Sequence, residues 1–497
     1  MGKAEFIYYN IENENKMNHK IITLLDSKSN RRIQLKFKEL RQDIWEAVSG
    51  TEQDFTEGKL GRAIFLLSIP MVLEMIMESI FAVVDIYFVS KLGADAVATV
   101  GITESLVTIV YSLAVGLSMA TTALVSRRIG EKNPSAASKA AFQAIFTGLI
   151  VSMFIAIPGA IFAPEMLALM GGTELMQEEY SSYTRIMLGA NGIIMMLFII
   201  NAIFRSSGDA AISMRVLWIA NLINIVLDPI LIFGMGPIPA MGVAGAATAT
   251  TIGRGLAVIY QFFLLANGKH RIKITFADMV IRAKTITKII RLSLGGIGQS
   301  LIATTSWIGL MKIVSEFGSE VVAGYTIGIR VIIFSLLPSW GISNAAATLV
   351  GQNLGAEKPE RAESSVWTTG KINAVFLGLM GIVFIIAPSF FIKLFIDDQL
   401  VVESGAACLR IMSYGFVMYG FGMVMIQAFN GAGDTLTPTK INLLSFWIIE
   451  IPLAWLLAIK LGFEQNGVYT AIVIAESFMT IVAIILFRQG KWKTRKV

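Results

Sequence analysis

Long apolar stretches recur along the chain after a polar start, and they limit the fold more than any other feature. A helix needs about 20 mostly apolar residues to cross the hydrocarbon core of a bilayer. Twelve such stretches are present, at residues 62–88, 96–124, 137–162, 180–204, 211–234, 242–266, 287–313, 320–349, 364–392, 404–429, 438–459 and 467–487. Transmembrane barrel strands alternate polar and apolar residues, so these unbroken runs exclude a barrel. The sequence therefore predicts an all-α membrane protein with twelve transmembrane helices.

Composition agrees with a membrane protein and excludes several other classes. Of the 497 residues, 55% are hydrophobic and only 15% are charged, whereas about a quarter of the residues of a soluble domain are charged. Cys408 is the single cysteine, and His19 and His270 lie outside the apolar stretches. A disulfide scaffold and a His/Cys metal site are therefore not expected. No Walker-type phosphate loop and no catalytic constellation is present, so neither ATP-driven transport nor an enzyme is predicted.

Basic residues alternate between successive connections and predict the orientation of the chain. The connections after the even-numbered stretches are rich in Lys and Arg, as in residues 127–139 and 269–284, and so is the tail at 488–496. The connections after the odd-numbered stretches hold few basic residues. Because basic connections remain in the cytoplasm, we expect a multi-pass protein of the cytoplasmic (inner) membrane with both termini in the cytoplasm.

The segment before the first stretch is polar and of mixed charge, which is not the pattern of a cleavable signal peptide. Apolar residues nevertheless recur there at helical spacing, with Lys36, Lys38 and Arg41 nearby: Ile33, Phe37, Leu40, Ile44 and Val48. This pattern predicts a short amphipathic helix on the inner membrane surface. A disordered extension without function is the alternative interpretation.

The two halves of the chain share an internal repeat at a fixed offset of 225 positions. Phe88–Gly93 reads FVSKLG and Ile313–Gly318 reads IVSEFG. The same offset pairs turn residues in four separate loops: Gly130 with Gly355, Pro134 with Pro359, Gly208-Asp209 with Gly433-Asp434, and Gly242-Val243 with Gly467-Val468. Each half holds six stretches, so both copies enter the membrane in the same direction. Parallel repeats are a transporter architecture, and a duplicated bundle such as a channel is the alternative.

The repeat and the apolar stretches together predict the domain boundaries. Residues 1–57 form a cytoplasmic extension, residues 58–270 form the amino-terminal six-helix lobe, and residues 287–490 form the carboxy-terminal six-helix lobe. Residues 271–286 are the cytoplasmic linker between the lobes, and residues 491–497 are a basic cytoplasmic tail.

Several short motifs resemble one known family. Val84–Gly93, the turns Gly208-Asp209 and Gly431–Asp434, and Asn224–Pro229 look like the multidrug and toxic compound extrusion (MATE) transporters, over roughly residues 58–490. The resemblance implies two pseudo-symmetric six-helix lobes in a V, alternating access, and export of cationic or amphipathic organic compounds against inward Na⁺ or H⁺ flow. It implies no cofactor besides the coupling ion. The expected partners are small organic molecules and the lipid bilayer, not nucleic acid, and the expected state is a monomer.

Within this family the chain is more similar to the DinF-like branch than to the NorM-like branch. NorM-like members carry an acid in span 7 and another in span 10, whereas Gln299–Thr305 and Ala406–Asn430 contain none. The DinF-like branch implies a cation-binding site in the amino-terminal lobe, from an Asp in span 1 and an Asn-x-x-x-Asp in span 5. Asp85, Asn224 and Asp228 match these positions.

A threonine in span 6 completes that site, and Thr248 is the best match, with Thr250 and Thr251 as alternatives. Asn224 and Asp228 are four residues apart, so both side chains leave the helix on one face. Oxygen ligands of this kind suit Na⁺, as they suit other hard cations. Two poorly solvated carboxylates would equally hold one proton. Either ion fits the pattern, and a structural role for Asp228 beside Pro229 is the alternative.

Other polar residues inside the predicted helices are candidates for a substrate cavity, because an ionisable group in a bilayer is costly without a partner. Glu74, Glu78 and Asp85 fall within about 40° on one helix face and form a stripe expected to face a cavity. Glu450 and Glu476 are candidates for a second proton or substrate site, and Asn201 and Met195 complete the predicted cavity residues.

Buried arginines and a proline complete the predictions inside the membrane. We expect Arg254, Arg330 and Arg410 to be buried partners of Glu104, Glu450 or Glu476, without a defined pairing. Pro70 removes a backbone hydrogen bond within span 1, so it permits a kink and is a candidate hinge.

Two transport functions compete for this sequence. The first is secondary active multidrug efflux by Na⁺- or H⁺-coupled antiport. The second is a flippase for lipid-linked precursors, which shares the superfamily architecture and lines its cavity with several basic residues. The acidic interior predicted for the amino-terminal lobe favours cations, and therefore multidrug efflux.

Overall fold

Long helices make up most of the computed structural model, which describes residues 38–50, 53–268, 270–495 and 497. The amino-terminal lobe contains α2 (Leu60–Ser90), α3 (Ala94–Gly130), α4 (Pro134–Ile161), the pair α7 (Ser181–Gly189) and α8 (Asn191–Ser207), α9 (Ala210–Phe233) and α10 (Val243–Asn267). Two short helices, α5 (Ala163–Leu169) and α6 (Glu174–Glu178), lie in the connection after α4. Among the described residues the only β-type pairing is the bridge between Met235 and Ile238.

The carboxy-terminal lobe repeats this order. It contains α11 (Ala283–Val314), α12 (Ser319–Gly355), α13 (Pro359–Ile386), the short α14 (Pro388–Lys393), the pair α15 (Gln399–Ser413) and α16 (Phe416–Ala432), and α19 (Glu464–Arg488). Between α16 and α19 one span runs through α17 (Leu436–Asn442), the π-helical η3 (Leu443–Glu450), α18 (Ile451–Trp455) and the π-helical η4 (Leu456–Lys460). Short 3₁₀ helices are η1 (Phe276–Asp278), η2 (Ser315–Phe317) and η5 (Lys491–Thr494).

Every predicted apolar stretch lies mainly within a helix, and the all-helical fold is confirmed. Ten helical segments of the described chain are long and apolar enough to cross a membrane, and α15 with α16, bent by 59°, forms an eleventh. The twelfth, α11, is 32 residues long, and glycines, serines and threonines dilute its apolar run. Its central position compensates for that polarity, because Ser293, Gly296 and Gln299 are buried against neighbouring helices.

The repeat governs where helices begin and end. Three helix pairs match at both ends at the offset of 225: α3 with α12, α4 with α13, and α8 with α16. Local signals explain part of this agreement. Asn133 caps α4 by accepting a hydrogen bond from the Ala136 amide at 3.0 Å, followed by proline at the first helical position, an arrangement that starts helices. Gly208 and Gly433 end α8 and α16 in the left-handed conformation, which glycine adopts without strain.

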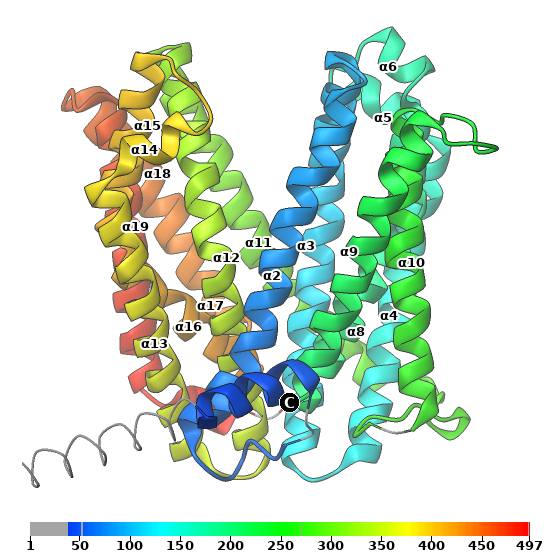
Figure 1. The fold of residues 1–497 in the computed structure, drawn as a ribbon. Coiled ribbons are helices and arrows are strands. Elements are labelled where there is room, and N and C mark those ends of the chain that lie inside the picture. Colours follow the sequence, from blue (N-terminus) through cyan, green and yellow to red (C-terminus); the bar gives the residue numbers. More distant parts are fainter. Residues whose placement is uncertain (1–37, 51–52, 269, 496) are drawn as a thin grey trace, which may run out of the picture.

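The two lobes form a V that is joined at one end (Figure 1). We call this end the basal side, because helix 38–49 and the carboxy-terminal residues lie there, and the other end the distal side. Four central helices make the junction, where α2 packs on α12 and α3 packs on α11 and α12. A Cβ atom at Gly116 would lie 2.7 Å from the Ser293 carbonyl oxygen, and one at Gly341 would lie 2.9 Å from the Met71 carbonyl carbon. Small residues thus allow the helices to touch.

The predicted extension is partly described. Residues 38–49 form a helix, on which Leu40, Ile44 and Trp45 are exposed, while Ile33 and Phe37 lie outside the described residues. The carboxy-terminal segment packs against the lobes: Trp492 is fully buried and stacks on Phe487 at 4.6 Å.

Candidate functional site

The polar stripe on α2 faces the other helices of its own lobe. Its three carboxylates interact at successive levels: Glu74 with Arg205 on α8, Glu78 with Arg254 on α10, and Asp85 with Asp228 on α9. Since α2 runs from the basal to the distal side, Asp85 lies on the distal half. The stripe predicted from the spacing is therefore present, and it points into the amino-terminal lobe.

Asp85, Asn224 and Asp228 come together in this lobe. Asn224 is 2% exposed and Asp228 is fully buried on α9, and the charges of Asp228 and Asp85 interact. Four buried oxygens accept no hydrogen bond from the described residues: Asp85 Oδ1, Asn224 Oδ1, Asp228 Oδ1 and Asp228 Oδ2. A buried carboxylate without a donor is costly, so this arrangement is suited to a bound cation or a proton.

Thr250, one of the two alternatives, provides the hydroxyl next to these oxygens. The Asn224 side-chain nitrogen donates to Thr250 Oγ1 at 3.0 Å, and both residues are buried. Thr248, the best match from the sequence, instead donates to the Ala244 carbonyl oxygen of its own helix at 2.7 Å. The two threonines are two positions apart, which is about 200° around α10, so only one of them can face α9. The structure therefore favours Thr250 over Thr248.

Arg254 lies one turn after Thr250 on α10 and is 6% exposed. Its guanidinium donates to the Tyr111 hydroxyl at 3.1 Å, lies 3.6 Å from Glu78 Oε2, and stacks over the Phe81 ring at 5.2 Å. Glu78 is thus the partner of Arg254, a pairing outside the set expected from the sequence.

Glu74, a predicted cavity residue, is buried in an ion pair. It is 3% exposed, and its Oε1 accepts a hydrogen bond from Arg205 at 2.8 Å. This ion pair fastens α2 to α8, and a role of Glu74 in a substrate cavity stays a prediction. The pairing of Glu74 with Arg205 was not among the predictions from the sequence.

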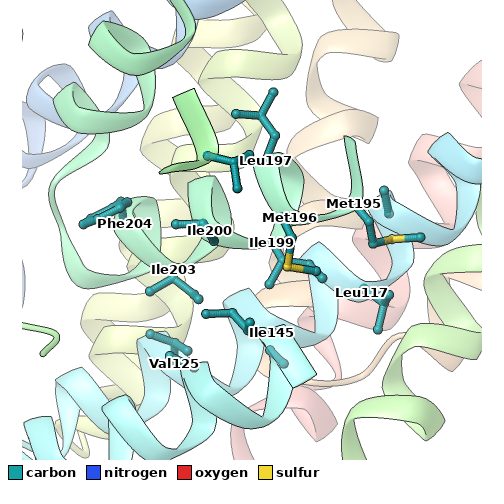
Figure 2. Close-up of a cluster of buried hydrophobic side chains, with 14 of the residues drawn as sticks. Leu117, Val125, Ile145, Met195, Met196, Leu197, Ile199, Ile200, Ile203 and Phe204 are labelled. Atoms are coloured by element: carbon teal, nitrogen blue, oxygen red, sulfur yellow. The ribbon is translucent and has the colours of Figure 1, made fainter. Parts of the chain in front are cut away.

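Asn201 and Met195, two further predicted cavity residues of this lobe, are also buried, and their role in a cavity stays a prediction. Asn201 is 4% exposed, and its Oδ1 accepts from Gln261 at 2.6 Å, which ties α8 to α10. Met195 is fully buried, and Figure 2 shows it within an apolar cluster that includes Leu117 and Ile199. Both side chains serve packing within the lobe.

Glu450 and Glu476 lie together in the carboxy-terminal lobe. Glu450 ends the π-helical segment η3, is 3% exposed, and accepts from the Ser306 hydroxyl at 2.6 Å. Glu476 on α19 interacts electrostatically with Glu450, and its Oε2 is buried without a hydrogen-bond partner among the described residues. The two predicted glutamates are therefore neighbours, but neither is paired with an arginine.

The remaining arginines and the proline differ in part from expectation. Arg330 and Arg410 are exposed rather than buried, and Arg330 on α12 interacts electrostatically with Glu104 on α3, across the lobes. Pro70 is buried, and α2 continues through it as one helix from Leu60 to Ser90. Its role as a hinge stays a prediction.

The donor set limits what the Asp85–Asp228 site can bind. The described residues contain no group of three or more Asp, Glu, His or Cys side chains that could hold a metal ion. The candidate donors are instead two carboxylates, one amide and one hydroxyl, and oxygen donors of this kind are those that hard cations prefer.

Comparisons with known proteins agree with the fold. The MatE family model matches residues 70–230 and 297–456, one stretch in each lobe and together more than half of the chain. The probable multidrug resistance protein YoeA of Bacillus subtilis is 23% identical over 443 residues, which covers 88% of this chain and 95% of that protein. The probable multidrug resistance protein NorM of Thermotoga maritima is 26% identical over 453 residues, with 88% and 94% covered.

Solved structures show the same architecture. The outward-facing conformation of a multidrug resistance MATE family transporter of the MOP superfamily is 24% identical, covers 90% of this chain and 99% of its own, and superimposes with a TM-score of 0.83. These relatives do not favour the flippase alternative. The family match, the apolar helices and the paired lobes together establish that this multi-pass membrane protein belongs to the MatE family, whose members are transporters and not enzymes.

Proposed function

We propose that this protein is a secondary active exporter that exchanges small cationic or amphipathic organic compounds for Na⁺ or H⁺. One observation carries the proposal: four buried oxygens of Asp85, Asn224 and Asp228 have no hydrogen-bond donor among the described residues. A cation or a proton at this position would remove the cost of burying two carboxylates. Coupling through the amino-terminal lobe is the DinF-like arrangement that the sequence predicts.

Alternating access follows from the same site. Asp85, the Asn224–Asp228 pair and Thr250 belong to α2, α9 and α10, so an ion bound among them favours the arrangement in which these three helices are close. Release of the ion leaves two repelling carboxylates and favours their separation. An ion can shift such an equilibrium only by its different affinity for the two states, and here that difference lies in the distance between α2 and α9.

Charge and orientation support the direction and the class of substrate. Glu74 and Glu78 are balanced by Arg205 and Arg254, so two carboxylates remain in excess at Asp85 and Asp228, which favours cations. The basic connections lie on the basal side, which we assign to the cytoplasm of a cell with an inner membrane. In this orientation the V opens away from the cytoplasm.

The proposal is tested by efflux from proteoliposomes under an imposed Na⁺ gradient or an imposed H⁺ gradient, one at a time. We expect Asp85→Asn and Asp228→Asn each to abolish ion-coupled efflux of a fluorescent organic cation, because the amide cannot supply the negative charge. Both variants should elute as folded protein in size-exclusion chromatography. Wild-type efflux rates in either variant would contradict the proposed site.

A matched control is available at the start of the next helix, α3. Asp95, at the start of α3, is an exposed carboxylate outside the site. We expect Asp95→Asn to transport at the wild-type rate, which separates loss of the site from loss of any carboxylate on the distal side.

A further inference from the structure

Arg254 is a positive charge enclosed in the amino-terminal lobe. Only 6% of the residue is exposed, and charged or aromatic groups of several helices surround it. It is in contact with Glu78, Phe81 and Tyr111, and it interacts electrostatically with Asp85. Tyr183 on α7 and Glu104 on α3 belong to the same electrostatic group. A permanently charged guanidinium in such a place strongly affects every neighbouring charge.

The contacts of Arg254 are incomplete. The ion pair with Glu78 is loose, at 3.6 Å, and the Glu78 side chain retains 29% of its exposure. The Arg254 Nε atom is buried and has no partner among the described residues, and neither has the Asp85 Oδ1 atom. One donor and one acceptor in the same lobe thus lack partners at the same time.

The helix geometry allows Arg254 to reach two acidic residues of α2, Glu78 and Asp85. Arg254 follows Thr250 by one turn on α10, so both face α9 and α2. Asp85 follows Glu78 by seven residues on α2, which is about 10 Å along the axis and nearly the same direction around it. The long side chain of an arginine can therefore move from the level of Glu78 toward that of Asp85 by changes of rotamer alone.

We propose that Arg254 is an internal counter-ion that competes with the coupling cation for Asp85. It pairs with Glu78 while the cation or proton occupies the Asp85–Asp228 site, and it moves toward Asp85 when that site is empty. This inference rests on the proposed function, because it assigns a second cation to the same site.

Competition from Arg254 would lower the energy of the site when no coupling ion is bound. An empty site would leave two carboxylates facing each other in a medium of low dielectric constant. A tethered arginine lowers the energy of that empty state and so weakens binding of the coupling ion to a level that allows its release. Arg254 is therefore a positioning residue that tunes ion affinity, whereas Asp85 and Asp228 are the groups in contact with the ion.

The test measures the concentration of the coupling ion that gives half-maximal efflux in proteoliposomes. Arg254→Gln removes the competing charge, so we expect that concentration to fall about tenfold, as expected for loss of one nearby charge. Glu78→Gln frees Arg254 for Asp85, so we expect the concentration to rise. Arg254→Lys keeps the charge and should stay closer to the wild type than Arg254→Gln. The double variant should resemble Arg254→Gln alone.

A control and two distinct failures complete the design. Arg215 on α9 is exposed, and Arg215→Gln removes an arginine from the same lobe, so it should leave the ion dependence unchanged. If Asp85→Asn abolishes coupling but Glu78→Gln and Arg254→Gln shift the half-maximal concentration in the same direction or not at all, the counter-ion role is wrong and the proposed function stands. If Asp85→Asn transports normally, the proposed site itself fails, and the counter-ion role fails with it.

Discussion

Side-chain pairing distinguishes the acidic residues of the amino-terminal lobe. Glu74 has Arg205 at 2.8 Å and Glu78 has Arg254 at 3.6 Å. Asp85 and Asp228 interact with each other and leave oxygens without donors. Four carboxylates of one chemical kind thus take two roles, and the position of an arginine decides which role each one takes. The paired glutamates hold helices together, whereas the aspartates keep oxygens without a donor, which is the basis of the proposed ion site.

The threonine beside the site provides a test at the scale of one hydroxyl. We expect Thr250→Val to weaken binding of the coupling ion about fivefold, because Asn224 loses a hydrogen bond worth about 1 kcal/mol. Thr248→Val should change ion binding little, since Thr248 bonds only to its own helix. The ion dependence of efflux in the two variants, measured side by side, checks this. An effect of equal size at both positions would contradict a specific role of Thr250 in ion binding.

At the scale of helices, close contact between the lobes depends on positions without a side chain. On α3, a Cβ atom at Gly116 would lie 2.6 Å from Ile297 Cγ1 and 2.7 Å from the Ser293 carbonyl oxygen of α11. On the same helix, a Cβ atom at Gly101 would meet nothing within 4 Å. The two glycines therefore differ in the space around them, a difference that the sequence alone does not show.

This difference predicts that replacement of glycine by valine lowers stability at one position and not at the other. Gly116→Val should lower the free energy of unfolding by about 1–3 kcal/mol, because it overpacks the α3–α11 contact. Gly101→Val should have almost no effect on stability. Thermal unfolding of both variants in one detergent checks the prediction, and equal melting temperatures would contradict the close packing of α3 on α11.

At the scale of the whole molecule, two chain segments tie the lobes on the basal side. Arg361 of the carboxy-terminal lobe donates to the carbonyl oxygens of Glu57 at 2.7 Å and Gly58 at 3.0 Å. Phe55 in this segment is buried beside Gly208 of the amino-terminal lobe. The chain before α2 therefore acts as a strap across both lobes.

A second strap crosses in the other direction. Arg127 and Arg128 at the end of α3 donate to the carbonyl oxygens of Arg495 and Val497 at 2.9 and 3.2 Å. The same segment is fixed to the carboxy-terminal lobe, where Arg495 lies 3.3 Å from Asp434. Both straps hold the basal ends together, which matches the V that opens on the distal side (Figure 1).

The straps predict a shift between conformations of the transporter. Arg361→Gln removes the hydrogen bonds to the first strap, so we expect a larger fraction of molecules with separated basal ends. Ser135 and Glu360 are exposed and equivalent positions on the two lobes. Spin labels there would report the separation of the basal ends as longer label–label distances in double electron–electron resonance. Arg282→Gln, an exposed arginine on the linker, is the control. Unchanged distances in Arg361→Gln would mean that the strap does not hold the basal side.

The sequence by itself determined the helices, the repeat and the family. These features follow from local physics: a bilayer requires long apolar runs, Pro134 and Pro359 begin helices, and Gly208 and Gly433 end them. It also placed Asp85, Asn224 and Asp228 in one site, because two of them share a helix face and the third matches a family motif. The DinF-like branch and the coupling ion stay predictions.

The tertiary structure decided which polar groups neutralise one another. Glu74 and Arg205 are 131 positions apart, so no local pattern could show that they form an ion pair. The burial of Met195 and Asn201 within the lobe likewise comes from packing between helices distant in the sequence. Thr250 rather than Thr248 adjoins Asn224 because α10 turns that face toward α9. Spacing along a helix fixes which residues share a face, but only packing fixes what that face meets.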